Sequence, residues 1–233
     1  MYNKSTDTVL KEVSSDSING LTKIEANNRL QKNGPNKLLT KKPKTLLSIF
    51  FAQINDAMIY ILIGAAIISA IMGEFSDSII ILIVIFINAI IGVVQESKAE
   101  KALSALKSLS TPKALVKRDG EIIEIPSEDV VIGDIVVIDA GRYIPCDLRL
   151  IETANLKIEE SAFTGESIPS DKDANIIIED ADVPIGDRKN MAYMSTLATY
   201  GRGLGVCVGT SMNTEIGKIA KMLDEEKEDL TPL

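Results

Sequence analysis

The chain has 233 residues, 45% of them hydrophobic but only 4% aromatic, and its 25 basic against 33 acidic residues give a net charge of -8. It contains no histidine, so catalysis must rest on carboxylates, hydroxyls or backbone groups rather than on the usual neutral-pH acid–base residue. The acidic balance argues against nucleic acid as a partner, and the distant Cys146 and Cys207 argue against a disulfide-dense secreted domain or a CxxC metal motif.

A polar lead-in, residues 1–45, precedes two apolar runs. The first, from Thr45 to Met72, contains only Asp56 as a charged residue, and the second, from Ile79 to Val94, contains none. Because a membrane-spanning helix needs about 20 apolar residues, we predict a transmembrane hairpin over residues 46–98, with spans at about 54–72 and 79–95. A pair of buried core helices in a soluble protein is the alternative, but the chain offers little equally apolar surface to pack against them.

Lysines flank the two runs, whereas the only charged residues in the short connection between them are acidic. The flanking lysines are Lys41, Lys42, Lys44, Lys98 and Lys101, and the acidic residues are Glu74 and Asp77. By the positive-inside rule both long ends face the cytoplasm. A cleaved signal peptide is not expected, because the first run begins about 45 residues into the chain. We therefore expect an integral protein of the plasma membrane, in contact with lipid.

After the second run, helical spacing of small and apolar residues continues and predicts a stalk helix over 99–112. The segment "KALVKRDGEIIEIP" then predicts two strands joined by an Asp119-Gly120 turn. Further short alternating runs follow, and "NTEIGKIAKMLDEEKE" predicts a helix capped by Asn213 or Thr214. The fold class is therefore mixed: a membrane hairpin and a mainly β cytosolic domain, 113–233, with flanking helices.

Two weaker patterns in this domain are not taken as sites. The glycines of "GRGLGVCVG" have the wrong third interval for a dinucleotide loop, and a strand follows where a helix should begin. Glu159 and Glu160 are adjacent in a predicted strand, so they point to opposite faces and are expected to be solvated or structural. No cofactor-binding or metal-binding residue is predicted in the chain.

The segment "SAFTGESIPS", residues 161–170, places one carboxylate at the tip of a loop. Together with the preceding "IEES", the upstream "GRYIPCDLRL" and the downstream "NMAYMSTLATYGRGLGVCVGTSMNTEIGKIA", it resembles the actuator domain of P-type cation-transporting ATPases. The segment "GLTKIEANNRLQKNGPNKL" also resembles the cytosolic lead-in of the calcium, sodium-potassium and proton pumps. The resemblance covers nearly the whole chain and implies a distorted jelly-roll type of β domain.

The resemblance also implies a role for the loop. Such pumps phosphorylate an aspartate in a separate domain and then hydrolyse the aspartyl phosphate. Glu166 resembles the family glutamate that orients or activates the attacking water. Gly165 would let the loop approach a crowded phosphate, and Thr164 and Ser167 would fix the loop and its polar contacts.

Parts of the family pattern are not found in this sequence. The phosphorylation motif DKTGT does not occur, and no nucleotide-binding segment can be recognised. We therefore expect the chain to be the N-terminal part of a pump of the calcium-transporting branch, ending before a third span and inactive alone. ATP and Mg²⁺ are implied for the complete pump, and the phosphorylation and nucleotide-binding domains and the transported cation are implied as partners.

Two other functions remain open from the residues. The chain could be a non-catalytic membrane-anchored β module that binds a partner protein, in which case a change at Glu166 would be silent. It could also be a truncated regulator that engages a full-length pump. Continuation of the coding DNA into an aspartyl-phosphorylation motif would separate these alternatives from the first.

Overall fold

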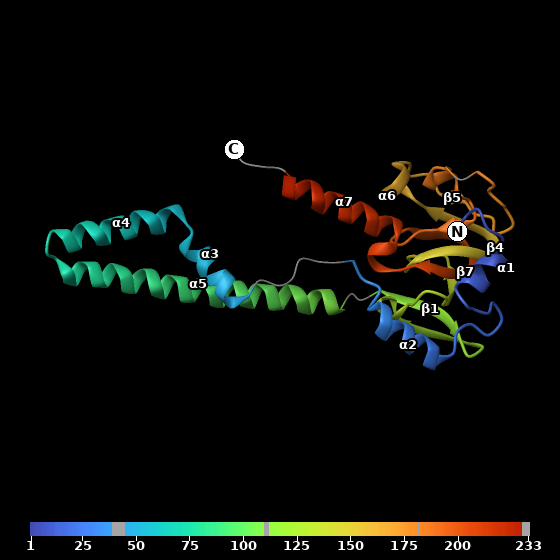
Figure 1. Cartoon of the computed structure of the whole chain (residues 1–233), viewed down its shortest axis with the longest axis horizontal. Coiled ribbons are helices and arrows are strands. Elements are labelled where there is room, and N and C mark those ends of the chain that lie inside the picture. Colours follow the sequence, from blue (N-terminus) through green and yellow to red (C-terminus); the bar gives the residue numbers. More distant parts are fainter. Residues whose placement is uncertain (39–44, 110–111, 181, 230–233) are drawn as a thin grey trace. The chain divides into compact units, whose positions relative to one another are not determined.

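A computed structural model of the chain describes residues 1–38, 45–109, 112–180 and 182–229, with side chains omitted for 103–109 and 224–229. The predicted flanking lysines Lys41, Lys42 and Lys44 lie outside these residues. The chain divides into two units (Figure 1): Met1–Leu39 with Thr111–Leu233, and Thr40–Ser110. We call them the β unit and the apolar unit. The predicted lead-in therefore belongs with the β domain in space.

An antiparallel sheet forms the centre of the β unit (Figure 1). Its strand order is β2-β1-β3-β7-β4-β5, and β6 pairs with β4. The strands are β1 (Lys113–Arg118), β2 (Glu121–Pro126), β3 (Ile135–Asp139), β4 (Asp147–Glu159), β5 (Ser170–Asp171), β6 (Met191–Ala192) and β7 (Leu197–Gly209). The long pair β4 and β7 carries several register shifts. These bulges strengthen the twist of the sheet around its middle.

Strands β1 and β2 form the hairpin that the sequence predicts. Lys113 to Arg118 pair in register with Pro126 to Glu121, which leaves Asp119 and Gly120 as a two-residue turn. Both turn residues have positive φ, 51° and 79°. This is the backbone of a type I′ turn, whose twist matches that of the flanking strands.

The two faces of the sheet are covered differently. One face buries the main core, which includes Val136, Ile138, Leu148, Leu150, Ile158 and Cys207. On the other face, Val9 and Val13 pack on Ile135 and Val206. Val9 lies in the short helix α1 (Thr6–Glu12), which begins at the N-cap Ser5. Strand alternation, with successive side chains on opposite faces, supplies apolar residues to both sides.

The N-terminal segment is tied to the sheet by polar contacts as well. Helix α2 (Lys23–Asn33) starts at the N-cap Thr22 and ends at Gly34, whose φ is 77°. Two residues later the buried Asn36 donates to the carbonyl oxygens of Ser127 and Pro145 and accepts the backbone N–H of Ser211. Its three hydrogen bonds join segments that are far apart in the sequence, so Asn36 fixes the path of the chain here.

Several helices, most of them short, follow the strands. They are η1 (Ser127–Asp129), α6 (Ser161–Thr164), η2 (Ile185–Asp187), η3 (Ser211–Asn213) and α7 (Glu215–Asp229). Of the two predicted caps of α7, Thr214 is the one used, because its Oγ1 accepts the N–H of Gly217 at 3.1 Å. The carboxylate of Asp147 on β4 accepts the N–H of Glu215 and joins the start of α7 to the sheet.

The apolar unit contains α3 (Leu46–Ile54), α4 (Ala57–Ile71) and α5 (Phe75–Leu109). Helix α5 continues without a break through the predicted second span and most of the predicted stalk, although the side chains of Leu103 and Leu106 lie outside the description. Within it, Phe75–Ala102 is long and apolar enough to cross a membrane. Helices α3 and α4 would provide a second crossing only if the two, bent by 66°, form one span.

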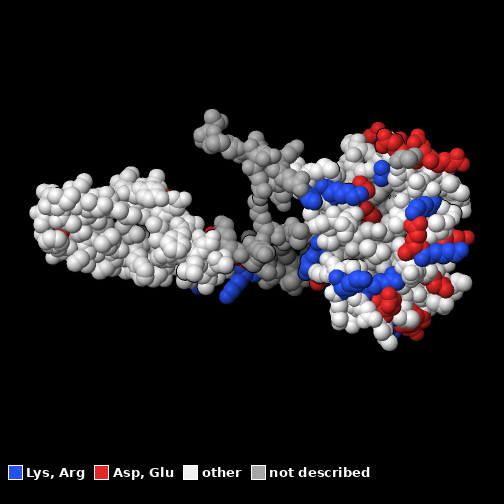
Figure 2. Space-filling model, in the orientation of Figure 1, with Lys and Arg blue, Asp and Glu red and all other residues white. Residues whose placement is uncertain are grey.

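The break between α3 and α4 falls inside the predicted first span. Asp56 is the N-cap of α4, where its Oδ1 accepts the N–H of Met58 at 2.8 Å. Helix α3 ends at its C-cap Asn55, and Asp56 starts the next helix, which the apolar composition alone does not reveal. In Figure 2 the visible face of this unit is almost free of charged side chains, whereas charges of both signs spread over the β unit.

Candidate functional site

The predicted loop leaves the sheet at the end of β4 and returns at β5. Its first residues form the single turn α6, in which the N–H groups of Phe163 and Thr164 donate to the carbonyl oxygen of Glu160. Gly165 ends this turn in the left-handed region, with φ 75° and ψ -2°. A glycine adopts this conformation without steric penalty, which explains why a glycine stands at this position.

Thr164 holds the turn from both sides. Its Oγ1 donates to the carbonyl oxygen of Glu160 and accepts the backbone N–H of Glu166, each at 3.2 Å. Its methyl group lies against Gly186, where an added Cβ would come within 2.8 Å of Thr164 Cγ2. The threonine is therefore fixed by polar contacts on one side and by close packing on the other.

Glu166 and Ser167 follow this turn and are both exposed. Within the part of the chain that the structure describes, the Glu166 carboxylate makes no hydrogen bond or ion pair. The next residue, Ile168, is 81% exposed. The loop thus presents a free carboxylate and a large apolar side chain together, and it brings all four predicted site residues, Thr164 to Ser167, into one short segment.

A cleft of about 460 Å³ lies beside the loop. It is lined by Glu160, Thr164, Glu166, Ile168, Pro169, Ser170, Asp171, Gly186, Asp187 and Lys189. Lys189 Nζ donates to Ser170 Oγ at 2.9 Å, which links the far side of the cleft to the returning strand β5. The carboxylate of Glu166 therefore stands at the rim of a polar cleft.

A buried ion pair lies beneath the loop. Lys172 Nζ is 2.7 Å from Glu160 Oε1, and the two side chains are 0% and 2% exposed. Burial raises the pKa of Glu160 and lowers the pKa of Lys172, and in each case the charge of the partner opposes the shift. From the sequence, Glu160 is expected to be solvated or structural together with Glu159, and neither Lys172 nor Lys189 is a candidate. The pairing of Lys157 and Ile158 with Asp171 and Ser170 brings Lys172 to Glu160.

A second polar cavity, of about 400 Å³, is lined in part by Tyr193. Asp147, Arg188, Glu215 and Lys218 contribute to its lining. The Asp147 carboxylate accepts the N–H groups of Met194 and Glu215. Burial nevertheless raises the pKa of Asp147 to about 6. This residue connects the sheet, the turn before β7 and helix α7.

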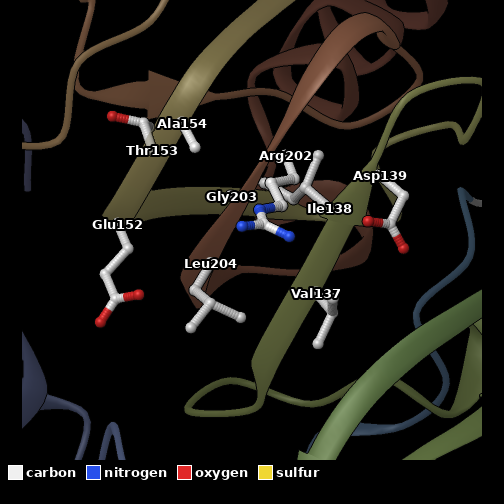
Figure 3. Close-up of a pocket in the computed structure, with 9 residues that line it drawn as sticks. All are labelled: Val137, Ile138, Asp139, Glu152, Thr153, Ala154, Arg202, Gly203 and Leu204. Atoms are coloured by element: carbon white, nitrogen blue, oxygen red, sulfur yellow. The ribbon is translucent and has the colours of Figure 1, made fainter.

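A third pocket, of about 330 Å³, lies on the sheet itself between β3, β4 and β7 (Figure 3). Val137 and Leu204 supply apolar surface, and the Arg202 side chain lies between the strands that carry Asp139 and Glu152 (Figure 3). No ion pair to Arg202 is found among the described residues. Its lining combines apolar side chains with Arg202 and the carboxylates of Asp139 and Glu152, a mixture suited to contact with another surface.

Among the residues described, no group of three or more His, Cys, Asp or Glu side chains is placed to hold a metal ion. Glu166 therefore offers a single carboxylate, suited to accepting a hydrogen bond or a proton from a group brought to it.

Comparison with known families identifies both parts of the chain. Residues 108–224 match the model of the P-type ATPase actuator domain, and residues 1–69 match that of the cation transporter/ATPase N-terminus. Actuator-domain similarity thus covers the whole sheet, the loop with Glu166 and the start of α7.

Individual relatives are similar over most or all of the chain. Calcium-transporting ATPase 1 of Bacillus cereus is 60% identical over 100% of the chain, and Calcium-transporting ATPase of Bacillus subtilis is 47% identical over 92%. Calcium-transporting ATPase 1 of Lactococcus lactis is 42% identical over 100%. The chain covers 26%, 24% and 26% of these three proteins, so it spans about a quarter of the length of the curated relatives it matches.

Proposed function

The chain belongs to the P-type ATPase family, and from this premise we propose that it supplies the actuator domain and adjoining membrane helices of an ATP-driven calcium pump. The proposal of calcium rests on relatives that are named calcium-transporting ATPases. The finer fold we propose is a distorted jelly roll, supported by the register shifts that bend the long β4–β7 pair.

The proposed chemical role is hydrolysis of an aspartyl phosphate held by another domain. A water molecule attacks phosphorus, the bond from phosphorus to the aspartyl oxygen breaks, and the water proton passes to the Glu166 carboxylate. The products are inorganic phosphate and the free aspartate. The observation that carries this role is the Glu166 carboxylate, exposed and unpaired among the described residues, at the tip of a loop fixed by Thr164.

The other loop residues have supporting roles. Gly165 leaves the space above the turn open, since an added Cβ there would meet nothing within 4 Å in this chain. This open space suits the close approach of a phosphorylated surface. Thr164 orients the N–H of Glu166, and we propose that Ser167 adds a polar contact to the approaching domain. Glu166 acts on the water, whereas the other three residues position it.

ATP and Mg²⁺ are assigned to domains outside this chain. The described residues do not offer a set of carboxylates that fits a metal ion. When bound in the complete pump, the metal and nucleotide would supply the phosphoryl group and neutralise its charge. The loop then acts only after that group has been transferred, and we expect the 233-residue chain alone to form no phosphoenzyme from ATP.

In the membrane, we propose that α5 forms one span and that α3 and α4 together form a second, bent one. Support comes from the apolar length of α5 and from the composition of the bent pair. Lysines beyond the ends of the two apolar runs favour placing the β unit in the cytoplasm and the connection near Glu74 on the other side. We propose the plasma membrane as the location.

The decisive experiment replaces Glu166 by glutamine in the longer protein. Loss of a water-positioning or general-base group slows the step about 10²–10⁴-fold, so phosphoenzyme should form from ATP but decay slowly. The exposed Glu179, outside the cleft lining, gives the matched control Glu179→Gln, which should leave decay unchanged.

Normal decay in Glu166→Gln with impaired formation from ATP would reject the proposed role. A partner-binding β module would then become the better assignment, and the Arg202 pocket would be its first candidate surface (Figure 3).

A further inference from the structure

The loop that carries Glu166 is closed at its base by a buried ion pair. Glu160 is the last residue before α6, and Lys172 is the first residue after β5, so the two flank the loop on its outgoing and returning sides. Their charged atoms lie 2.7 Å apart and are shielded from solvent. The pair therefore joins the two ends of an excursion of eleven residues, 161–171.

Glu160 is connected to the turn through its backbone. Its carbonyl oxygen accepts the N–H groups of Phe163 and Thr164 and the hydroxyl of Thr164. The same hydroxyl accepts the N–H of Glu166. Any displacement of Glu160 is thus passed through Thr164 to the residue that carries the free carboxylate.

Lys172 is held independently on the other side. Its backbone N–H donates to the carbonyl oxygen of Leu156 in β4. Lys189 Nζ donates to Ser170 Oγ, two residues before Lys172, and Lys189 lines the cleft. The lysine is thus anchored to the rigid sheet, and Glu160 is fixed with respect to that anchor.

A buried ion pair is a poor source of stability but a good source of fixed geometry. Desolvation of two charges offsets much of their attraction, and well-packed apolar replacements are often as stable. Removing one partner, by contrast, leaves an unpaired buried charge. At this position the pair serves to fix the position and direction of the loop relative to the sheet.

We propose that Glu160 and Lys172 are positioning residues that set the Glu166 loop for attack on the aspartyl phosphate. The inference rests on the proposed function of Glu166 and adds two residues to it. Neither side chain touches the reacting atoms; both act through Thr164 and the turn.

The first test uses the longer protein with the apolar pair Glu160→Leu/Lys172→Met, chosen because it removes both charges together. A misplacement of about 1 Å can slow a reaction by about 10²-fold, so phosphoenzyme decay should slow by roughly that factor while formation from ATP persists. The matched control is the remote buried pair Arg118 and Asp134, joined at 2.6 Å, replaced as Arg118→Met/Asp134→Leu.

Combining the Glu160→Leu/Lys172→Met replacement with Glu166→Gln distinguishes a positioning role from a purely structural one. If the pair acts through Glu166, its replacement in that background should change decay by less than about 2-fold, because coupled residues are not additive. Wild-type decay in the apolar pair, equal slowing in the control pair, or full additivity with Glu166→Gln would each overturn the inference.

A second measurement does not depend on the phosphoenzyme. In the 233-residue chain in detergent, amide exchange over residues 161–166 should become faster in the Glu160→Leu/Lys172→Met variant and stay unchanged in the control pair. Unchanged exchange in both variants would contradict positioning by the pair. Faster exchange in Glu160→Leu/Lys172→Met together with normal decay in Glu166→Gln would reject the proposed function of Glu166. It would still support the role of the Glu160–Lys172 pair in fixing the loop.

Discussion

The hydroxyl of Thr164 accepts the backbone N–H of Glu166 at 3.2 Å while it donates to the carbonyl oxygen of Glu160. A serine can keep both hydrogen bonds, and a valine can keep neither. Because each net hydrogen bond is worth about 0.5–1.5 kcal/mol, Thr164→Val should slow phosphoenzyme decay by about 10-fold. Thr164→Ser should remain much closer to wild type. Slow decay in Thr164→Ser with normal decay in Thr164→Val would show that the methyl contact with Gly186, and not the hydroxyl, matters.

Two variants of Gly165 distinguish its effect on stability from its effect on phosphoenzyme decay. Its φ of 75° costs about 1–2 kcal/mol for an alanine, and less for an asparagine, which visits this region more readily. Gly165→Ala should therefore lower the unfolding free energy of the chain by about that amount, and Gly165→Asn should lower it less.

In the longer protein both Gly165 variants should slow phosphoenzyme decay, because either side chain would stand between the turn and the phosphorylated surface. A Gly165→Asn pump with normal decay would contradict the close approach that we propose. Denaturant unfolding of the chain in detergent and phosphoenzyme decay measured on the same variants give the two readouts.

Asp147 predicts a pH dependence of stability. Burial raises its pKa from the ordinary value of 3.8 to about 6, the nearby Glu215 adds to the rise, and Lys218 and the Met194 and Glu215 amides oppose it. Because the folded-state pKa is raised, the stabilisation linked to this carboxyl is full below about pH 4 and is lost as the pH rises through about 6.

The matching variant is Asp147→Asn, which does not titrate. The difference in unfolding free energy, wild type minus variant, should shrink by up to about 3 kcal/mol between pH 4 and pH 7. Denaturant unfolding of both chains across this range is the measurement. A difference that stays constant with pH would show that Asp147 keeps an ordinary pKa.

Asn36 should be a stabilising residue far from the loop. Its side chain makes three hydrogen bonds to backbone groups and is 3% exposed. Asn36→Ala removes all three hydrogen bonds from a buried position, so the unfolding free energy should fall by about 1–3 kcal/mol. The exposed Asn33→Ala at the end of α2 is the control and should change it little. A similar loss in both variants would contradict the assigned contacts.

The proposed topology can be checked by labelling. Ser76, exposed in the first turn of α5, can be replaced by cysteine, and the two native cysteines are 0% exposed and should give little background. In intact cells an impermeant maleimide should label Ser76→Cys from the outside. Labelling only after the cytoplasmic face is opened would reverse the orientation that the lysines suggest.

Local patterns in the sequence predicted the regular elements well. The Asp119-Gly120 turn was confirmed because its backbone preference is local, and the helix after Thr214 was confirmed for the same reason. Only short alternating runs were predicted after the Asp119-Gly120 turn, but Asp147–Glu159 forms one long strand, β4, since bulges carry it through polar positions. Asp56 was noted only as a lone charge, although as a helix cap it divides an apolar run.

The candidate site shows the limit of sequence reasoning more clearly. The loop from Thr164 to Ser167 could be picked out from its residues alone, and its catalytic role remains a prediction. The partnership of Glu160 and Lys172 could not be foreseen, because twelve positions separate them and only the β4–β5 register makes them neighbours. Strand alternation predicts the face of the sheet on which a side chain lies, but it does not predict which distant charged residue that side chain contacts.

The contacts of Asn36 also determine when the β unit can be completed during synthesis. Its partners Ser127, Pro145 and Ser211 follow it by 91, 109 and 175 residues, with the apolar unit made in between. At about 5–20 residues per second, Asn36 waits roughly 9 to 35 s for Ser211. For nearly all of this interval Val9 lacks Val206 of β7, which covers it in the completed sheet. The polar composition of the first 38 residues thus suits a segment that must stay soluble on the ribosome until that strand has been made.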